Sequence, residues 1–184
     1  CQKVADDLRV QAFHGRHLQV EIDTRDLRGG EKNWSWVKKG VPIRVEVGPR
    51  DMAEDSLFTA RRDRPAKEKQ GIPRAEFIAT ITTMLEDIQQ TLHDRALTFR
   101  ETHTHDLENE SDFREFFTAP AGEPTPIHAG FAMTHFCGDQ ALEEQIKNDL
   151  GVTIRCIPSE PGEPGTCPFT GAPSPQKVVW AKSY

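Results

Sequence analysis

A five-residue run in the first third of the chain predicts a half-buried strand. Its apolar residues occupy every second position and would share one face of a sheet: Ile43, Val45 and Val47. The intervening Arg44 and Glu46 would face the other way. Proline cannot donate to a sheet ladder, so Pro42 and Pro49 belong at the two ends of this strand. The same alternation predicts a second strand over Leu18–Ile22.

Apolar residues at helical spacing predict three further elements. A short amphipathic pattern predicts a helix from Cys1 to about Val10. After Pro73, a stripe of apolar residues three and four positions apart predicts one long helix from Ala75 to about Phe99. We interpret this stripe as core packing. A third helix is predicted from about Gln140 to Leu150.

Shorter patterns complete the expected elements. Four more apolar runs predict strands: Ser56–Ala60, Gly130–Met133, Val152–Ile157 and Val178–Ala181. Asp51–Asp55 is expected to form an acidic turn. Residues 61–69, in which basic and acidic residues alternate, are expected to form a solvated hairpin or loop. The Pro/Gly-rich segment Pro158–Pro175 is expected to be a loop.

Positive charge is concentrated around the first strand. Residues 25–50 hold seven Lys or Arg against three acids, whereas the whole chain has a net charge of -6. The long polar connection Asp23–Lys39 should end in a short helix that carries Trp34 and Trp36. Basic side chains neutralise phosphates and aromatic rings stack on bases, as single-stranded RNA recognition requires. A solvated basic face with two packed tryptophans is the alternative interpretation.

Several sequence strings resemble one enzyme family. In the first half these are VEIDTRD (Val20–Asp26), GEK (Gly30–Lys32) and KGVPIRVEVGPRD (Lys39–Asp51). In the second half they are LTFRETHT (Leu97–Thr104), FCGD (Phe136–Asp139), RCIP (Arg155–Pro158) and VVWAKSY (Val178–Tyr184). They occur in the same order in the C-terminal part of class II prolyl-tRNA synthetases of the archaeal and eukaryotic type. The chain therefore resembles the anticodon-binding domain and the C-terminal domain of that family.

The resemblance implies an RNA site on this segment. In the family, the residues at the positions of Arg44, Arg50 and Asp51 contact the two guanines that proline anticodons share. An arginine fork suits guanine O6 and N7, and a carboxylate can accept from guanine N1 and N2. With the basic and aromatic residues around them, the candidate anticodon site comprises Lys32, Trp34, Trp36, Lys38, Lys39, Arg44, Arg50 and Asp51. The structural alternative pairs Arg44 with Glu46 or Asp51 as a surface salt bridge.

One departure from the family pattern affects this site. Where many members have a glutamate that reads guanine, this chain has Val37. A valine accepts no hydrogen bond, so Glu31 or Asp51 would have to supply that contact. We also expect Trp34 or Trp36 to stack on an anticodon base and to compensate in part. Packing in the core is the alternative for both rings.

A second departure concerns zinc. Family members that bind zinc use C-x4-C followed by C-x2-C, and here only Cys137 and Cys167 remain, because Leu142 and Thr170 replace their partners. Structural zinc requires four N or S ligands. Cys156 and His135 could in principle complete a set, but we expect no zinc, and the remaining thiols to be buried.

The resemblance implies the following organisation. An α/β anticodon-binding domain with a mixed sheet, whose first strand is missing, should span residues 1–74. A connecting helix should span 75–104, and a small α+β domain homologous to the zinc domain should span 105–184. In the family the C-terminal tyrosine points toward the catalytic domain, so Tyr184 is expected to help dock that domain.

The expected function is anticodon recognition on tRNA(Pro) by the C-terminal part of a proline–tRNA ligase. ATP and Mg2+ would act in a catalytic domain outside this chain, which itself would hold no cofactor and no catalytic residue. The full-length protein is expected to be a cytoplasmic homodimer without membrane contact, since no apolar stretch approaches the roughly 20 residues of a membrane span. One alternative is a free-standing, non-catalytic RNA-binding paralogue. Another is a metal or redox module built on Cys137, Cys156 and Cys167.

Overall fold

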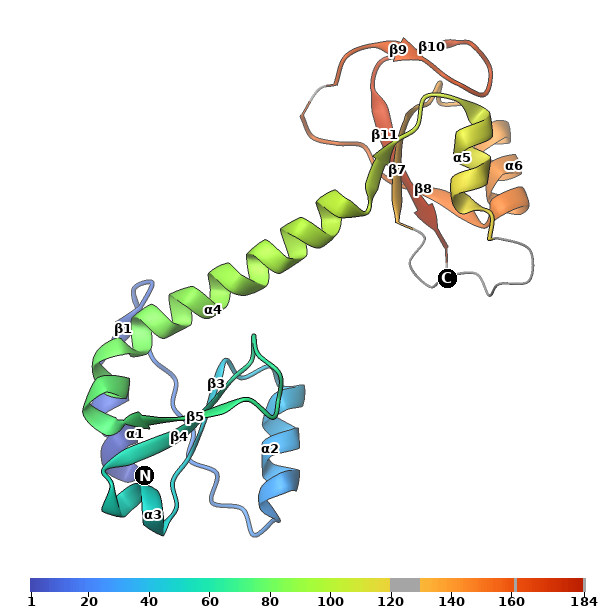
Figure 1. Ribbon diagram of the computed structural model, residues 1–184. Coiled ribbons are helices and arrows are strands. Elements are labelled where there is room, and N and C mark those ends of the chain that lie inside the picture. Colours follow the sequence, from blue (N-terminus) through green and yellow to red (C-terminus); the bar gives the residue numbers. More distant parts are fainter. Residues whose placement is uncertain (120–129, 161, 184) are drawn as a thin grey trace. The chain divides into compact units, whose positions relative to one another are not determined.

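The computed structural model describes residues 1–119, 130–160 and 162–183. The chain forms two compact units, Cys1–Ala96 and Leu97–Tyr184. The long helix α4 (Arg74–Thr102) begins in the first unit and ends in the second (Figure 1). Among the helices of these ranges, none combines the length and the hydrophobicity needed to cross a membrane.

The first unit is built around a three-stranded antiparallel sheet. Its elements before α4 are α1 (Gln2–Arg9), β1 (Ala12–Phe13), β2 (Arg16–His17), α2 (Gly29–Lys38), β3 (Ile43–Glu46), α3 (Pro49–Ala53), β4 (Ser56–Arg61) and β5 (Lys69–Pro73). The strand order is β3-β4-β5, and β1 and β2 form a separate hairpin. Gly40, with a φ of 73°, ends α2 in the left-handed conformation that glycine adopts most readily and turns the chain into β3.

Different elements pack on the two faces of this sheet. Leu57 of β4 packs in a core with Leu8 of α1 and Phe77 of α4. On the other face, Arg44 of β3 lies directly opposite Ala60 of β4. Residues that oppose each other across a ladder project to the same side, and neighbours along a strand alternate. Arg44 therefore faces away from the Leu57 core, toward the side on which α2 lies (Figure 1).

The second unit is a four-stranded mixed sheet with two helices. Its elements after α4 are β6 (Thr104–Asp106), α5 (Glu110–Phe117), β7 (Phe131–His135), α6 (Gln140–Leu150), β8 (Val152–Cys156), β9 (Gly165–Thr166), β10 (Pro173–Ser174) and β11 (Lys177–Lys182). The order is β6-β7-β11-β8, and β9 pairs with β10. The pair β6–β7 is parallel, whereas β11 is antiparallel to both of its neighbours.

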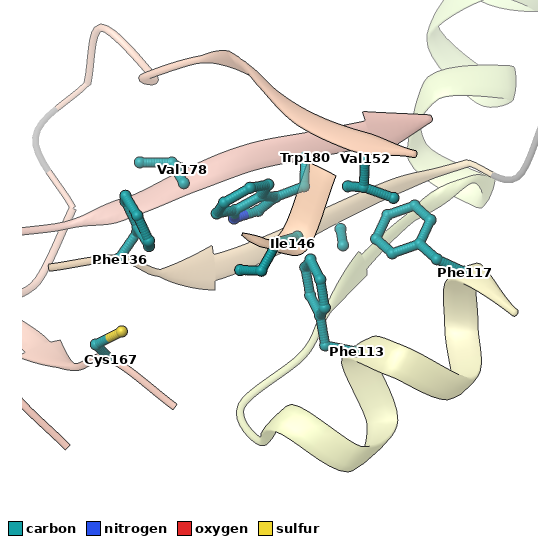
Figure 2. Packing of buried hydrophobic residues seen from close by; sticks show 9 residues of the cluster. Phe113, Phe117, Phe136, Ile146, Val152, Cys167, Val178 and Trp180 are labelled. Carbon is teal, nitrogen blue, oxygen red and sulfur yellow. The ribbon is translucent and has the colours of Figure 1, made fainter. Parts of the chain in front are cut away.

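An aromatic cluster forms the core of the second unit (Figure 2). Trp180 of β11 is fully buried. Phe113 of α5 and Phe136, which follows β7, meet it edge to face, with ring centroids 5.5 and 5.2 Å away. Such aromatic pairs contribute about 0.5–1.5 kcal/mol beyond their area burial. The cluster ties α5 to the sheet.

The predicted helices and most predicted strands are confirmed, including the helix that carries Trp34 and Trp36. The strand predicted over Leu18–Ile22 is wrong, because this segment has no ladder partner among the described residues. Leu18 and Val20 nevertheless pack against the core of the first unit. Their alternation thus reflects burial on one side and not pairing. The acidic turn predicted over Asp51–Asp55 is confirmed only for residues 54–55, because residues 49–53 form α3.

Two further expectations need correction. The mixed sheet was expected in the first unit, but the strands β3, β4 and β5 are antiparallel, and the parallel pair lies in the second unit. Residues 61–69 do lie in the β4–β5 hairpin, yet Asp63 is buried and not solvated. Its carboxylate accepts hydrogen bonds from Nε and Nη2 of Arg61 at 3.0 and 2.7 Å. Nη2 of Arg61 also bonds to Asp87 of α4, so the hairpin is held to that helix.

Candidate nucleic-acid interface

Arg44 is held in place by a neutral partner. Its Nε donates to Oδ1 of Asn33 on α2, at 2.8 Å. Within the described part of the chain, neither Nη group of Arg44 makes a hydrogen bond. The predicted alternative partner Glu46 accepts instead from Lys69 at 2.6 Å. The surface salt bridge considered for Arg44 is therefore not formed, and two pairs of N–H donors remain for another molecule.

Arg50 and Asp51 lie side by side in the first turn of α3. The carboxylate of Asp51 accepts from the backbone N–H of Gly48 at 2.7 Å, which caps the helix, and Pro49 at the first helical position favours the same start. The side chain of Arg50 is 87% exposed and its Nε lies 3.1 Å from Glu54. A pair this exposed contributes about 0–1 kcal/mol, so Arg50 can exchange it for another anion at little cost.

Trp36 is anchored by a partly buried polar network. Its Nε1 donates to Asp23 at 2.7 Å, and Arg25 donates to the same carboxylate through Nε at 2.9 Å and Nη2 at 2.6 Å. The Arg25 guanidinium, together with the bond from Trp36, holds the pKa of Asp23 well below its usual range although desolvation opposes this. Nζ of Lys39 lies 4.2 Å from the centroid of the Trp36 ring. The ring is thus already in contact with a hydrogen-bond acceptor and a cation.

Trp34 has different surroundings. It is 58% exposed, and Nζ of Lys38 lies 5.7 Å from its ring centroid. Two residues apart on a helix means about 200° of rotation, so the two tryptophans face opposite ways. Of the two rings considered for base stacking, Trp34 is therefore the more exposed.

Lys32, a further candidate residue, contacts the network around Asp23. Nζ of Lys32 lies 3.4 Å from the backbone oxygen of Asp23 and is partly buried, whereas Lys38 and Lys39 are exposed. Neither Asp23 nor Asn33 stands out as a site residue in the sequence. Neither residue carries a positive charge or an aromatic ring, and each acts by holding one that does.

Comparison with known proteins assigns both units. A family described as "Anticodon binding domain" matches residues 1–84, and one described as "Prolyl-tRNA synthetase, C-terminal" matches residues 126–184. A "Proline--tRNA ligase 2" of Anaeromyxobacter dehalogenans is 52% identical over 188 residues, covering 100% of this chain and 37% of that protein. A "Proline--tRNA ligase" of Protochlamydia amoebophila is 46% identical over 186 residues, covering 100% of this chain and 36% of that protein. The chain is thus similar over its whole length to the C-terminal part of prolyl-tRNA synthetases.

A solved structure of the same family has a similar fold. The prolyl-tRNA synthetase from Cryptosporidium parvum, complexed with L-proline and AMP, matches with a TM-score of 0.72 at 24% identity. The match covers 100% of this chain and 36% of that one. The chain thus spans about a third of the length of its prolyl-tRNA synthetase relatives and matches their C-terminal part.

Both carboxylates proposed to substitute for the family's glutamate already accept a hydrogen bond from the backbone. Val37 is half-buried on α2. The side chain of Glu31 accepts from the backbone N–H of Arg28 at 3.3 Å, at the start of α2, and Asp51 caps α3. Each acid stabilises a helix start, so either would have to lose that hydrogen bond to read a base.

The cysteines at the prolyl-tRNA synthetase zinc positions do not fit a zinc site. Thr170, which replaces one cysteine ligand, lies with Oγ1 3.6 Å from Sγ of Cys137 and donates to it. Among residues 1–119, 130–160 and 162–183, no three His, Cys, Asp or Glu side chains converge as metal ligands, so neither His135 nor Cys156 completes a set there. Two thiolates fall short of the four ligands of structural zinc. Tyr184, the expected docking residue, lies outside the described residues.

Proposed function

We propose that this chain reads the anticodon of tRNA(Pro) as the C-terminal part of a proline–tRNA ligase. The observation that carries this proposal is the state of Arg44, whose guanidinium is oriented by Asn33 while its Nη groups have no hydrogen-bond partner among the described residues. Two parallel N–H groups from one fixed guanidinium match guanine O6 and N7. A salt bridge between Arg44 and a carboxylate of the chain would have occupied these same N–H groups.

Arg50, Asp51 and Trp34 complete the proposed contacts. Arg50 is exposed and weakly paired, and the start of α3 places it six positions after Arg44, within about 20 Å along the chain. Asp51 is adjacent and has a second carboxylate oxygen beyond the one that caps α3. Trp34 offers an exposed ring on α2 for stacking. Lys32, Trp36 and Lys39 act around Asp23 as the support of this surface, with Lys38 and Lys39 also attracting phosphate.

The full-length protein would ligate proline to tRNA(Pro). ATP and Mg2+ would be used by a catalytic domain outside this chain, with which the C-terminal tyrosine Tyr184 would dock. Anticodon binding would help to hold the distant acceptor end in place, which is a proximity effect. We further propose a cytoplasmic homodimer, a division into residues 1–74, 75–104 and 105–184, and the absence of zinc, which metal analysis of the purified chain would test.

Binding measurements on the isolated chain test the anticodon proposal. A tRNA(Pro) transcript is compared with one whose two anticodon guanines are replaced, both at about 150 mM salt so that phosphate attraction is partly screened. We expect Arg44→Ala to weaken binding of the first transcript by about 1–3 kcal/mol and that of the second much less. Arg64→Ala is the matched control, because this arginine belongs to the same unit and pairs with Glu68 on the surface. Equal losses for both transcripts would contradict guanine readout.

A further inference from the structure

Phe58 lies on the same face of the three-stranded sheet as Arg44. Arg44 is opposite Ala60, which is two residues after Phe58 on β4, so the side chains of Arg44 and Phe58 project to the same side as diagonal neighbours. The adjacent Leu57 points the other way, into the core of the unit. Ala60 is 4% exposed, whereas Phe58 is 38% exposed. The residues that bury Ala60 therefore leave part of the Phe58 ring accessible.

The surface beside this ring is open. Phe58 is directly opposite Gly71 of the edge strand β5. An aromatic side chain in this position can cover the glycine. Here, no heavy atom of the other described residues, apart from the chain neighbours of Gly71, lies within 4 Å of the point where a Cβ of Gly71 would stand. Because glycine in a strand often marks close approach of a ligand to the backbone, a flat group can lie over Gly71, against the exposed part of the ring.

Cationic side chains adjoin the open surface. Nζ of Lys69 lies 5.5 Å from the centroid of the Phe58 ring and is held by Glu46 at 2.6 Å. Since this lysine is paired with an acid, the unbalanced positive charge on this face comes from Arg44, which is held by the neutral Asn33. An accessible aromatic ring next to cations on the face of a sheet is the arrangement on which single-stranded nucleic acids stack their bases.

We propose that Phe58 and Gly71 form a stacking platform for one nucleobase next to the guanines that Arg44 contacts. This inference rests on the proposed anticodon function and adds a further subsite to it. Trp34 on α2 and Phe58 on β4 would hold two different bases of the same RNA strand. Because every base has a π-face, the platform accepts any base and contributes affinity without selecting a sequence.

Substitution of the ring tests the platform on the 184-residue chain. Phe58→Leu keeps an apolar side chain but removes the ring, and should weaken binding of tRNA(Pro) about five- to a hundredfold, the usual range for one stacked base. The transcript with replaced anticodon guanines should lose the same factor, because stacking tolerates any base. Phe58→Tyr keeps a ring and should bind like the unaltered chain. Phe13→Leu is the matched control, since this aromatic residue borders α4, which packs on the Leu57 face of the sheet.

Filling the open surface tests the platform without changing the ring. Gly71 does not adopt a left-handed backbone conformation, and valine suits a strand better than glycine does. Gly71→Val should therefore keep or raise the melting temperature, while tRNA affinity falls about fivefold or more because the new side chain occupies the place of the base. A purely structural role of this position would leave the affinity unchanged.

A fluorescent base reports the stacking directly. 2-Aminopurine is placed on either side of the two guanines in an anticodon stem–loop, one position at a time, and its fluorescence falls when it stacks. With saturating protein, Phe58→Leu should restore the fluorescence at one of the two positions, and Phe13→Leu at neither. Unchanged affinity and unchanged fluorescence in Phe58→Leu would overturn the platform but leave guanine discrimination intact. Lack of guanine discrimination by the unaltered chain would instead refute the anticodon proposal, and with it the position of the platform next to the guanines.

Discussion

Nε of Arg44 donates to Oδ1 of Asn33 at 2.8 Å, which joins β3 to α2. The bond leaves the charge of the guanidinium uncompensated, because an amide oxygen carries no formal charge. A carboxylate at the same place would hold the arginine equally well and would also neutralise it. The choice of an amide therefore fits a side chain that is positioned by the fold and used by another molecule.

This relationship predicts opposite effects of two substitutions at position 33. Asn33→Asp should lower tRNA(Pro) affinity at least tenfold, about 1.4 kcal/mol, because the new carboxylate would pair with Arg44 and repel phosphate, while the melting temperature stays equal or rises. Asn33→Ala should lower affinity by about 1 kcal/mol through loss of one charge-assisted hydrogen bond. Titration calorimetry and thermal unfolding measure the two quantities. Unchanged affinity in Asn33→Asp would show that the Nη groups of Arg44 do not contact the RNA.

The two tryptophans of α2 should respond differently to substitution. Trp34→Ala should weaken tRNA binding by about 1–3 kcal/mol, the usual contribution of an aromatic stacking on a base, with little change in stability because the ring is exposed. Trp36→Phe should leave Asp23 without the 2.7 Å bond from Nε1 and reduce the free energy of unfolding by about 1–3 kcal/mol. Urea unfolding and RNA binding are measured on both variants. A destabilised Trp34→Ala with normal affinity would contradict the assignment.

The Arg61–Asp63 pair predicts acid sensitivity of the first unit. The hydrogen bonds from Arg61 hold the pKa of buried Asp63 below its ordinary value, although desolvation opposes this shift. The unfolded chain, with a carboxyl pKa of about 3.9, then binds more protons in acid than the folded chain does. The stability that this group contributes is therefore present above about pH 4 and is lost as the pH falls further.

Replacing the acid should remove that contribution at neutral pH. Asp63→Asn leaves Asp87 as the only carboxylate partner of Arg61. It should reduce the free energy of unfolding by about 3 kcal/mol, the lower end for breaking a buried ion pair. Its stability should also fall less steeply between pH 5 and pH 3 than that of the unaltered chain, as urea midpoints at each pH would measure. Asp87→Asn is the control, because that side chain is 57% exposed and its loss should cost about 1 kcal/mol or less. Similar losses in the two variants would refute a special role for the buried carboxylate.

Local signals in the sequence predict the bounds of an element correctly where they coincide with burial in the folded protein. For α6, Asp139 accepts from the N–H groups of Ala141 and Leu142, and Gly151 adopts the left-handed conformation at the other end. Both residue types mark helix ends in the sequence itself, and the predicted bounds Gln140–Leu150 are those observed. Similarly, Pro49 and Asp51 are a readable start signal for α3, but the surrounding acids favoured a turn.

Other features depend on partners that are distant in the sequence. The alternation over Leu18–Ile22 reports which side chains are buried, but a strand also needs a neighbour with free N–H and C=O groups, and no periodicity reveals that. The different roles of Trp34 and Trp36 follow from Asp23, which lies outside the helix. The spacing of the two tryptophans alone therefore does not decide between base stacking and packing for either ring. The contact between Thr170 and Cys137 likewise exists only once the segment after β7 and the β9–β10 turn have packed.

Restoring a carboxylate at position 37 gives the sharpest test of how the site reads guanine. Val37 lies one helical turn after Asn33, so the two side chains share a face of α2. Val37→Glu should therefore place an acceptor near the guanidinium of Arg44 and raise discrimination between tRNA(Pro) and the transcript with replaced anticodon guanines by about 1–3 kcal/mol. Val37→Gln is the control for size without charge and should give a smaller gain. If Glu at position 37 instead pairs with Arg44, affinity for both transcripts falls, and Arg44→Ala then has little further effect; this result would contradict a guanine-reading role for a carboxylate at this position.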